Sequence, residues 1–373
     1  MKILTIIGAR PQFVKAAVLS RVFSKMNGVE ELLVHTGQHF DDKMSQIFFD
    51  EMEIPKPHYN LEINSLGHGA MTGRMLEGIE SLIIKEKPNW VMVYGDTNST
   101  LAGALAAKKI HVKVAHVEAG LRSFNMQMPE EINRILTDRI SDVLYAPTQT
   151  AVDNLRHEGF DNFSSQIVLS GDVMQDAALF YAQKAEEKSI LDRSLLQGDF
   201  VLSTIHRQEN TDNPENLKAI VKALNKINKQ MRVVLPLHPR TRKIISNLNL
   251  NLNASIIDPV GYFDMIQLLK NCTLVMTDSG GLQKEAFFFK KQCVTLREQT
   301  EWVELIQGGF NVLTGANEHL IVDAFTKMVN TKSDFSVNLY GNGSAGEAIA
   351  NHLLKNTISY LSKVFFLKIS QET

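Results

Sequence analysis

Residues 90–100 carry the sequence WVMVYGDTNST, and this stretch decides the fold. Its apolar and aromatic part, Trp90–Tyr94, predicts a strand buried on both faces, and Gly95 begins a polar turn. The pattern of Ser99–Lys109 then predicts a helix, and Val112–Val117 predicts another strand. A strand, a helix and a second strand in this order are typical of parallel sheets covered by helices.

The same alternation extends through both halves of the chain. Apolar β-branched runs predict further strands at Ile3–Ile7, Glu31–His35, Val143–Ala146, Phe200–Ile205, Val233–Leu237, Ala254–Ile257, Leu274–Met276 and Val294–Leu296. The sequence therefore predicts an α/β fold of two doubly wound, Rossmann-like domains that face each other across a cleft. We place the first domain at residues 1–170 and the second at 171–345. A terminal helix at 346–373 is expected to cross back to the first domain.

Composition argues against several classes of protein. The 39 Lys and Arg residues balance 41 Asp and Glu residues, so no basic excess indicates a nucleic-acid or membrane-surface partner. The two cysteines, Cys272 and Cys293, form no CxxC pair, which argues against a disulfide framework or a zinc site. No run reaches the roughly 18 apolar residues that a transmembrane helix needs, and the apolar start is too short for a signal peptide. We therefore expect a cytoplasmic protein.

Cations follow the first predicted strand, where ligands of such sheets bind. Arg10 and Lys15 stand at and near the start of a helix. The helix dipole makes that end positive, so two cations there fit a bound anion such as a phosphate. The alternative is that Lys15 reaches solvent or a nearby carboxylate, and this motif alone does not separate the two.

Three carboxylates occupy equivalent places further along. Asp96 lies in the turn after a strand, Glu118 ends the next strand, and Glu130 opens the helix that follows. Acidic residues are common in a first helical turn, so Glu130 alone is weak evidence. Together the three are expected to meet at one sheet edge, where mutual repulsion favours proton exchange. A divalent metal is the rival explanation, but no phosphate-loop or histidine-rich motif supports it, and we expect no metal.

Histidine and arginine residues end two strands of the second half. His206-Arg207 follows one strand, and His238 follows another as part of His-Pro-Arg. A lone histidine is more often structural. Two such clusters in one domain favour contacts with an anion or a substrate.

A glycine-rich turn follows the strand Leu274–Met276. Ser279 is a good helix N-cap, and Gly280 and Gly281 let backbone N–H groups approach a diphosphate. Glu285, inside the helix, fits ribose hydroxyls. The alternative is a plain strand-to-helix turn.

One motif suggests a different cofactor. Residues 341–346, GNGSAG, match the GxGxxG pattern of dinucleotide sites. No βαβ unit precedes them, and no acidic residue follows at the required spacing. We therefore reject NAD binding and expect no cofactor.

Taken together, the motifs resemble those of the non-hydrolysing UDP-N-acetylglucosamine 2-epimerases. The resemblance covers nearly the whole chain and rests on Gly8-Ala9-Arg10-Pro11, Gly95-Asp96-Thr97, HVEAGLR at 116–122, Pro129-Glu130-Glu131, His206-Arg207, Asp278-Ser279-Gly280-Gly281 and Tyr340-Gly341-Asn342-Gly343. It implies a fold like that of two-domain (GT-B) glycosyltransferases, with UDP on the second domain. The implied reaction eliminates UDP to give a glycal and adds it back with inversion at C-2.

The resemblance also implies roles for individual residues. Asp96, Glu118 and Glu130 match the catalytic acids, and we add His206 to the catalytic set. The expected substrate contacts are Arg10, Lys15, His206, Arg207, His238, Ser279, Gly280, Gly281 and Glu285. The expected partners are a UDP-sugar and a second copy of the chain in a homodimer.

Two departures from the family pattern bear on the substrate. Trp302 replaces a substrate-contact arginine of the better-known members. Leu66-Gly67-His68-Gly69 stands where members with an activating second site carry Arg-Gln, although Gln38 and His39 remain. The opening motif and the Thr-Glu-Trp segment look more like the branch that includes UDP-2,3-diacetamido-glucuronate 2-epimerases.

The leading hypothesis is interconversion of UDP-GlcNAc and UDP-ManNAc. One alternative is a 2-epimerase of a modified UDP-HexNAc such as the diacetamido-glucuronate. Others are a hydrolysing epimerase, a glycosyltransferase of similar fold, and a nucleotide-sugar sensor without catalysis. The three acids argue against a sensor, because binding alone does not require them.

Overall fold

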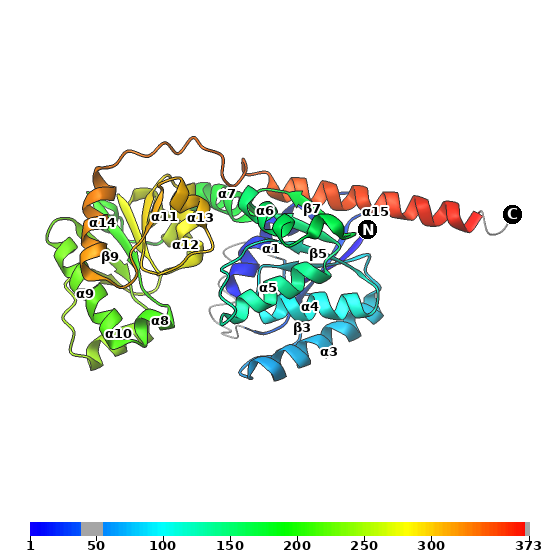
Figure 1. Ribbon diagram of the computed structural model, residues 1–373, viewed down its shortest axis with the longest axis horizontal. Helices are drawn as coiled ribbons and strands as arrows, with labels where there is room; N and C mark the ends of the chain where they lie inside the picture. The colour runs from blue at the N-terminus through cyan, green and yellow to red at the C-terminus, as the bar shows by residue number, and fades with distance from the viewer. Residues whose placement is uncertain (39–54, 370–373) are drawn as a thin grey trace. The chain divides into compact units, whose positions relative to one another are not determined.

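The computed structural model describes residues 1–38 and 55–369, without the side chains of Arg10 and of residues 359–369. The chain divides into two compact units, coloured by residue number in Figure 1. Unit 1 comprises Met1–Ala177 and Leu339–Thr373, and unit 2 comprises Ala178–Asn338. Each unit is described below by itself.

Unit 1 is built on a seven-stranded parallel sheet with the order β3-β2-β1-β4-β5-β6-β7. The strands are β1 (Lys2–Ile7), β2 (Glu30–His35), β3 (Tyr59–Asn60), β4 (Trp90–Tyr94), β5 (Lys113–Val117), β6 (Val143–Ala146) and β7 (Gln166–Leu169). β1 pairs with both β2 and β4, so the strand order reverses beside it. In doubly wound sheets, ligands bind beyond the carboxyl ends of the strands near such a reversal.

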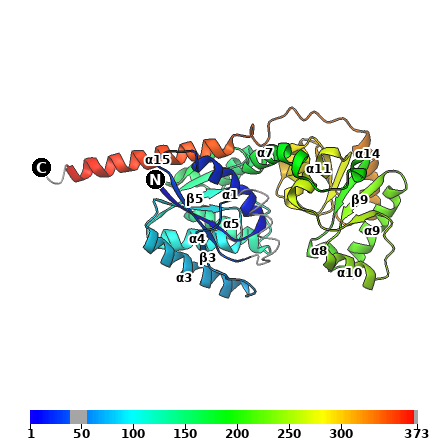
Figure 2. The ribbon, with the colours of Figure 1, turned by 180° about the vertical axis from the view of Figure 1, so that it is seen from behind.

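Helices cover both faces of this sheet (Figures 1 and 2). They are α1 (Arg10–Phe23), α3 (His68–Glu86), α4 (Asn98–Lys109), α5 (Pro129–Ile140), α6 (Gln149–His157) and α15 (Ala345–Ile369), with a 3-10 turn at Phe160–Asn162. A core of buried aliphatic side chains lies between the sheet and α3 and α4. α1 and α15 pack together, and the Trp90 indole of β4 donates to Thr357 Oγ1 of α15 at 2.8 Å.

The end of the chain returns to unit 1 through backbone contacts near residue 172. Asp172 N donates to Tyr340 O at 2.8 Å, and the Asp176 carboxylate accepts the backbone N–H groups of Ala345 and Gly346. The structure therefore divides the chain at 177/178 and 338/339, where the sequence analysis places boundaries at 170/171 and 345/346. Helix α7 (Val173–Lys188) spans the first of these boundaries.

The GxGxxG match at 341–346 lies at this crossing and not between a strand and a helix of a βαβ unit. A Cβ on Gly346 would come within 2.7 Å of Val18 Cγ1 in α1, so a glycine there lets α15 approach α1 closely. Gly341 has a φ of +97° beside Gly171. These glycines are explained by packing and turn geometry.

Unit 2 contains a six-stranded parallel sheet with the order β10-β9-β8-β11-β12-β13. Its strands are β8 (Phe200–Thr204), β9 (Arg232–Pro236), β10 (Ser255–Ile257), β11 (Leu274–Thr277), β12 (Gln292–Thr295) and β13 (Asn311–Leu313). Its helices are α8 (Gln208–Thr211), α9 (Pro214–Asn228), α10 (Pro239–Asn247), α11 (Tyr262–Asn271), α12 (Gly280–Phe288), α13 (Val303–Gln307) and α14 (Glu318–Asn330), with a 3-10 turn at Arg193–Leu196. One apolar core packs α9 and α14 on the sheet, and a second packs α11 and α12 on its other face.

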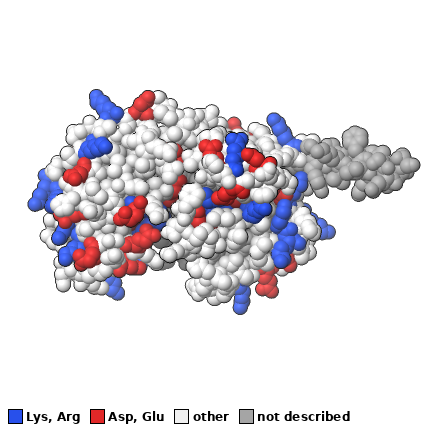
Figure 3. Space-filling model, viewed as in Figure 1, with Lys and Arg blue, Asp and Glu red and all other residues white. Residues whose placement is uncertain are grey.

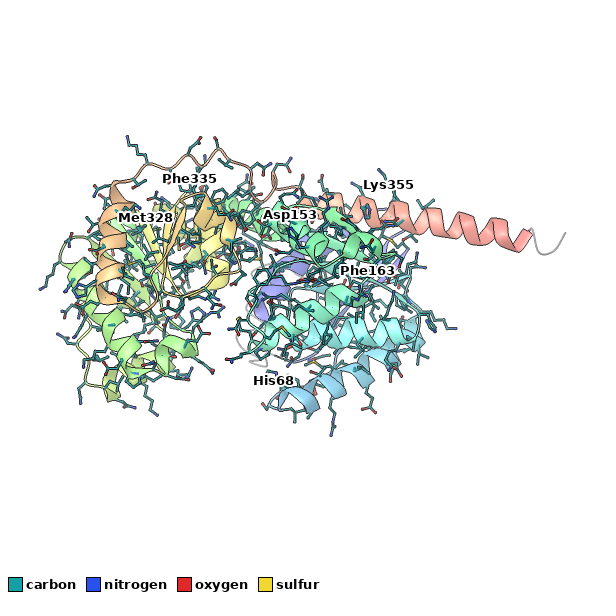
Figure 4. All side chains as sticks on the ribbon, viewed as in Figure 1. His68, Asp153, Phe163, Met328, Phe335 and Lys355 are labelled. Atoms are coloured by element: carbon teal, nitrogen blue, oxygen red, sulfur yellow. The ribbon has the colours of Figure 1, made fainter. Side chains whose placement is uncertain are left out.

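The chain leaves unit 2 over an aromatic cluster. Phe335 (labelled in Figure 4) packs on Phe310 and Phe287, with ring centroids 5.1 and 5.7 Å away. Lys and Arg side chains alternate with Asp and Glu over the face shown in Figure 3. Among the described residues, no helix has the length and apolar character to cross a membrane.

The predicted α/β class with two doubly wound sheets is confirmed. Sequence analysis missed the short strands β3, β7 and β13, which have two to four residues and do not form long apolar runs. Cys272 and Cys293 are both buried and carry thiols, not a disulfide.

Candidate active site

Lys15 and Glu118 form a buried ion pair at the carboxyl edge of the unit 1 sheet. Lys15 Nζ lies 2.6 Å from Glu118 Oε1, and both side chains are less than one tenth exposed. Gly95, in the turn after β4, faces both groups, since a Cβ there would lie 3.3 Å from the ammonium and 3.6 Å from the carboxylate. Sequence analysis left open whether Lys15 meets a bound anion, solvent or a nearby carboxylate. In the structure, Lys15 lies beside the carboxylate of Glu118.

Glu118 adopts a strained backbone conformation. Its φ is +69°, in the left-handed region that non-glycine residues rarely adopt, at a cost of about 1 kcal/mol. The N–H groups of Glu118 and Ala119 both donate to Tyr145 O of β6, at 3.1 and 3.0 Å, which holds this conformation. Such strain is common where a side chain must be aimed at a functional site.

Asp96 is held by the helix after β5. Arg134 of α5 donates to Asp96 Oδ2, and Asn133 Nδ2 donates to the Asp96 carbonyl at 2.9 Å. The Asp96 side chain keeps 28% of its exposure, so its carboxylate remains accessible from the edge. Sequence analysis did not identify Arg134 as its partner.

The two adjacent glutamates at the start of α5 differ in environment. Glu131 is fully buried and accepts the backbone N–H groups of Ser123 and Phe124, both at 2.9 Å, and an Arg134 N–H at 2.8 Å. The Glu130 side chain is exposed and makes no hydrogen bond or ion pair within the described part of the chain. Glu131 therefore stabilises the loop, and Glu130 is open to a ligand.

Gln12 links the turns after β1 and β4. Its Oε1 accepts the N–H groups of Gly8 and Ala9, and its Nε2 donates to Tyr94 O at 2.8 Å. This buried amide fixes the start of α1, where Arg10 is the first residue. The signal for Gln12 in the sequence is a polar residue in the first turn of a helix whose later residues are largely apolar.

Some predicted residues are described only in part. The Arg10 side chain lies outside the described residues, as does all of His39. Gln38 is described, and its Oε1 accepts both the N–H and the hydroxyl of Ser99, at 3.1 and 2.8 Å.

In unit 2, the Asp278 carboxylate organises the loop after β8. It accepts the backbone N–H groups of His206 and Arg207 and the Asn210 amide, each at 3.1 Å, and lies 3.0 Å from His206 Nδ1. Burial raises the pKa of Asp278, but the hydrogen bonds and charge of His206 outweigh this and lower it overall. The His206 ring is about half exposed, so its other nitrogen is accessible. Sequence analysis gave Asp278 and Asn210 no role of their own.

The start of α12 is partly exposed at Gly280 and exposed at Gly281. The Ser279 hydroxyl accepts from Leu282 N, and the space beside Gly281 is empty to 4 Å. A Cβ on Gly280 would instead collide with the Glu301 carboxylate, which pairs with Arg297 at 3.0 Å. The open approach to this helix start is therefore at Gly281.

Glu285 and His238 occupy different surroundings. Glu285 is buried in α12 and lies near Tyr262. Burial raises the pKa of the Tyr262 phenol, and the charge of Glu285 raises it further. His238 caps α10, where its Nδ1 accepts Arg240 N at 3.2 Å, and its ring is exposed. Within the described residues, no group of three or more His, Cys, Asp or Glu side chains is arranged to hold a metal ion.

Comparison with known proteins matches residues 21–354 to the UDP-N-acetylglucosamine 2-epimerase family. The chain belongs to this family. It is 58% identical over 356 residues to the UDP-2,3-diacetamido-2,3-dideoxy-D-glucuronate 2-epimerase of Pseudomonas aeruginosa, covering 95% of this chain and all of that one. The crystal structure of Methanocaldococcus jannaschii UDP-GlcNAc 2-epimerase with UDP-GlcNAc and UDP has a TM-score of 0.87 at 43% identity, covering 95% and 100% of the two chains. The Neisseria meningitidis enzyme bound to UDP-GlcNAc has a TM-score of 0.84 at 31% identity, with the same coverage.

The family resemblance seen in the sequence is thus confirmed. Trp302, which replaces a substrate-contact arginine of the better-known members, was expected near the substrate, but it lies in a different environment. Trp302 is 3% exposed and its ring lies 3.9 Å from Lys284 Nζ in α12. In this epimerase-family chain, Trp302 packs inside unit 2 and supports the helix that carries Gly281.

Proposed function

We propose that this chain is a non-hydrolysing 2-epimerase of UDP-N-acetylhexosamines. The observation that carries the proposal is the buried Lys15–Glu118 pair beside Asp96 at the carboxyl edge of unit 1. Carboxylates placed in this way exchange protons with a substrate. The residue roles predicted from the sequence, including those of Glu130 and His206, stand as part of this proposal.

The proposed reaction is an elimination followed by an addition. A carboxylate takes the C-2 proton, the C-1 to oxygen bond breaks with its electron pair leaving on UDP, and a C-1 to C-2 double bond forms. UDP oxygen then bonds to C-1 again, and an acid returns a proton to the opposite face of C-2. Lys15 lies beside Glu118 and balances its charge while the carboxylate is ionised.

The departing diphosphate requires positive groups and N–H donors. In unit 2, the N–H groups at the start of α12 beside Gly281 and the exposed face of His206 supply them. We propose that unit 2 binds UDP there, with Glu285 near the ribose.

Two substrates are candidates. The UDP-GlcNAc and UDP-ManNAc pair is supported by the similarity to the M. jannaschii enzyme. The 58% identity to the P. aeruginosa enzyme favours UDP-2,3-diacetamido-glucuronate as the second candidate. Because Trp302 offers no guanidinium fork where the better-known enzymes have an arginine, we expect the modified sugar to be used at least as well as UDP-GlcNAc.

The test is incubation with each UDP-sugar in D₂O, followed by proton NMR. The proposal predicts UDP-linked epimers with deuterium at C-2, in the product and in recovered substrate, and unchanged rates with a chelator. Free UDP with free sugar would indicate a hydrolysing enzyme, and binding without exchange would indicate a sensor. Exclusive use of UDP-GlcNAc would contradict the substrate preference. The cytoplasmic location and the homodimer remain predictions.

A further inference from the structure

His116 lies in the interior of unit 1, directly behind the proposed catalytic edge. Its ring is fully buried in β5. Nδ1 lies 2.7 Å from Asp138 Oδ1 of α5, and Nε2 lies 2.7 Å from the Gly95 carbonyl oxygen at the end of β4. Both ring nitrogens therefore face groups that accept hydrogen bonds.

The state of Asp138 decides how many protons the ring carries. Asp138 Oδ2 accepts Arg122 Nη1 at 2.7 Å and Gly120 N at 3.1 Å. Burial opposes ionisation of Asp138, but the Arg122 guanidinium and the Gly120 N–H both donate to its carboxylate and favour the ionised form. An ionised carboxylate and a carbonyl are acceptors only, which requires a proton on each nitrogen of His116.

The charges around this ring balance. Arg122 also donates to both oxygens of Glu158 at the end of α6, at 2.6 and 2.8 Å. A charged His116 with Arg122 thus meets Asp138 and Glu158, two cations with two anions. Buried ions are tolerated when each is paired and hydrogen-bonded, as His116, Arg122 and Asp138 are, and Glu158 pairs with Arg122 from a more exposed position.

We propose that His116 carries a proton on both ring nitrogens and, with Asp138, positions the two turns bearing Asp96 and Glu118. His116 holds the Gly95 carbonyl, which belongs to the peptide bond leading into Asp96. Asp138 holds the Gly120 N–H, two residues after Glu118. The protonation state of His116 is a property of the fold, whereas the effect of His116 on catalysis rests on the proposed epimerase function.

The first experiment measures the ring protons directly. Nitrogen-15 NMR of the wild-type protein labelled at histidine, with His116→Gln to assign the signal, is expected to show both nitrogens protonated at pH 7. In Asp138→Asn, one nitrogen should shift to the unprotonated range at this pH. One unprotonated nitrogen in the wild type at pH 7 would overturn the proposal, whether or not the protein is an epimerase.

The second experiment measures positioning. His116→Gln removes the charge and one donor, so kcat is expected to fall by about tenfold to a hundredfold while KM stays unchanged, because misplaced groups slow the chemical step more than binding. His352→Gln, at a partly buried histidine on α15 of unit 1, is the control and should retain kcat. Wild-type kcat in a folded His116→Gln variant would overturn the positioning role.

Discussion

Glu131 and Asp138 differ from Asp96 and Glu118 in how their oxygens are used. The first two are fully buried, and all their oxygens have hydrogen-bond partners: backbone N–H groups and Arg134 for Glu131, and Gly120 N, Arg122 and His116 for Asp138. Asp96 and Glu118 each pair with a cation and keep side-chain exposures of 28% and 9%. Asp96 and Glu118, at the sheet edge with oxygens not held by backbone N–H groups, are suited to exchanging protons, whereas Glu131 and Asp138 are suited to holding loops.

Glu118→Gln is expected to lower turnover by about a hundredfold, because an amide cannot take up a proton at neutral pH. UDP binding should be largely kept, since unit 2 carries the proposed diphosphate contacts. Deuterium exchange at C-2, followed by NMR, measures the change. The matched control is Glu86→Gln. Glu86 forms an ion pair with Lys2 at 2.7 Å at the other edge of unit 1, and the change removes its carboxylate. Near wild-type exchange in Glu118→Gln would contradict the assigned role.

The pH dependence of stability tests Asp278. Its folded pKa is depressed, so the unfolded chain binds a proton more readily, and the stabilisation is present above the unfolded value of about 3.9 and lost as pH falls through the folded value. Urea unfolding of the wild type from pH 6 to pH 3 is expected to show this loss. Asp278→Asn should be less stable at pH 6 and less sensitive to acid. Asp258→Asn, at an exposed pair with Arg242, should behave like the wild type.

At the level of elements, strand order predicts where side chains lie but not what they contact. Asp96 and Glu118 follow neighbouring parallel strands, so their common edge was predictable from the alternating pattern. The partner of Glu118 is Lys15, 103 residues away, and that of Asp96 is Arg134, 38 residues away. Such pairings depend on how helices pack on the sheet, which no local pattern specifies.

The glycine pair of α12 shows the same limit. Sequence analysis treats Gly280 and Gly281 alike, whereas the Glu301 carboxylate occupies the side of Gly280 and the side of Gly281 is open. The carboxylate comes from the loop after β12, and its position is set by tertiary packing. A substitution at Gly280 would therefore disturb the Arg297–Glu301 pair and would not report on ligand binding alone.

Gly281→Leu is the sharper test of the UDP site. A side chain there fills the open approach to the N–H groups, and a hydrogen bond to a charged phosphate contributes about 1.5–3 kcal/mol. Calorimetry is expected to show UDP affinity reduced by about tenfold or more. Gly73→Leu, at an exposed glycine of α3 that also faces open space, is the matched control. Unchanged UDP affinity in Gly281→Leu would place the site elsewhere.

At the scale of the whole molecule, the two units repeat one strand pattern with different chemistry at their edges. Unit 1 presents carboxylates and unit 2 presents N–H donors and a histidine, and this division was predictable from the residues that follow each strand. The terminal segment was predicted to be helical, and α15 packs on α1 within unit 1. The short strands and the exact crossing points were not, because backbone contacts such as that of Asp172 with Tyr340 determine them.

Regulation belongs to this scale, because an activating second ligand would have to alter the reaction from outside the reacting groups. The segment Leu66–Gly69 is exposed at the start of α3, and His68 Nδ1 lies 3.2 Å from Asn98 Nδ2, near the turn that carries Asp96 (His68 is labelled in Figure 4). An imidazole bonded to an amide offers no substitute for the missing arginine, whose fork of donors would clasp a diphosphate. We therefore expect hyperbolic kinetics with UDP-GlcNAc, with no activation by a second molecule. Initial rates measured over a wide range of UDP-GlcNAc test this, and a sigmoidal curve would show that a regulatory site persists. His68→Arg restores a guanidinium there. If only the arginine has been lost, sigmoidal kinetics should return in this variant, and if the whole regulatory site has been lost, the kinetics should stay hyperbolic.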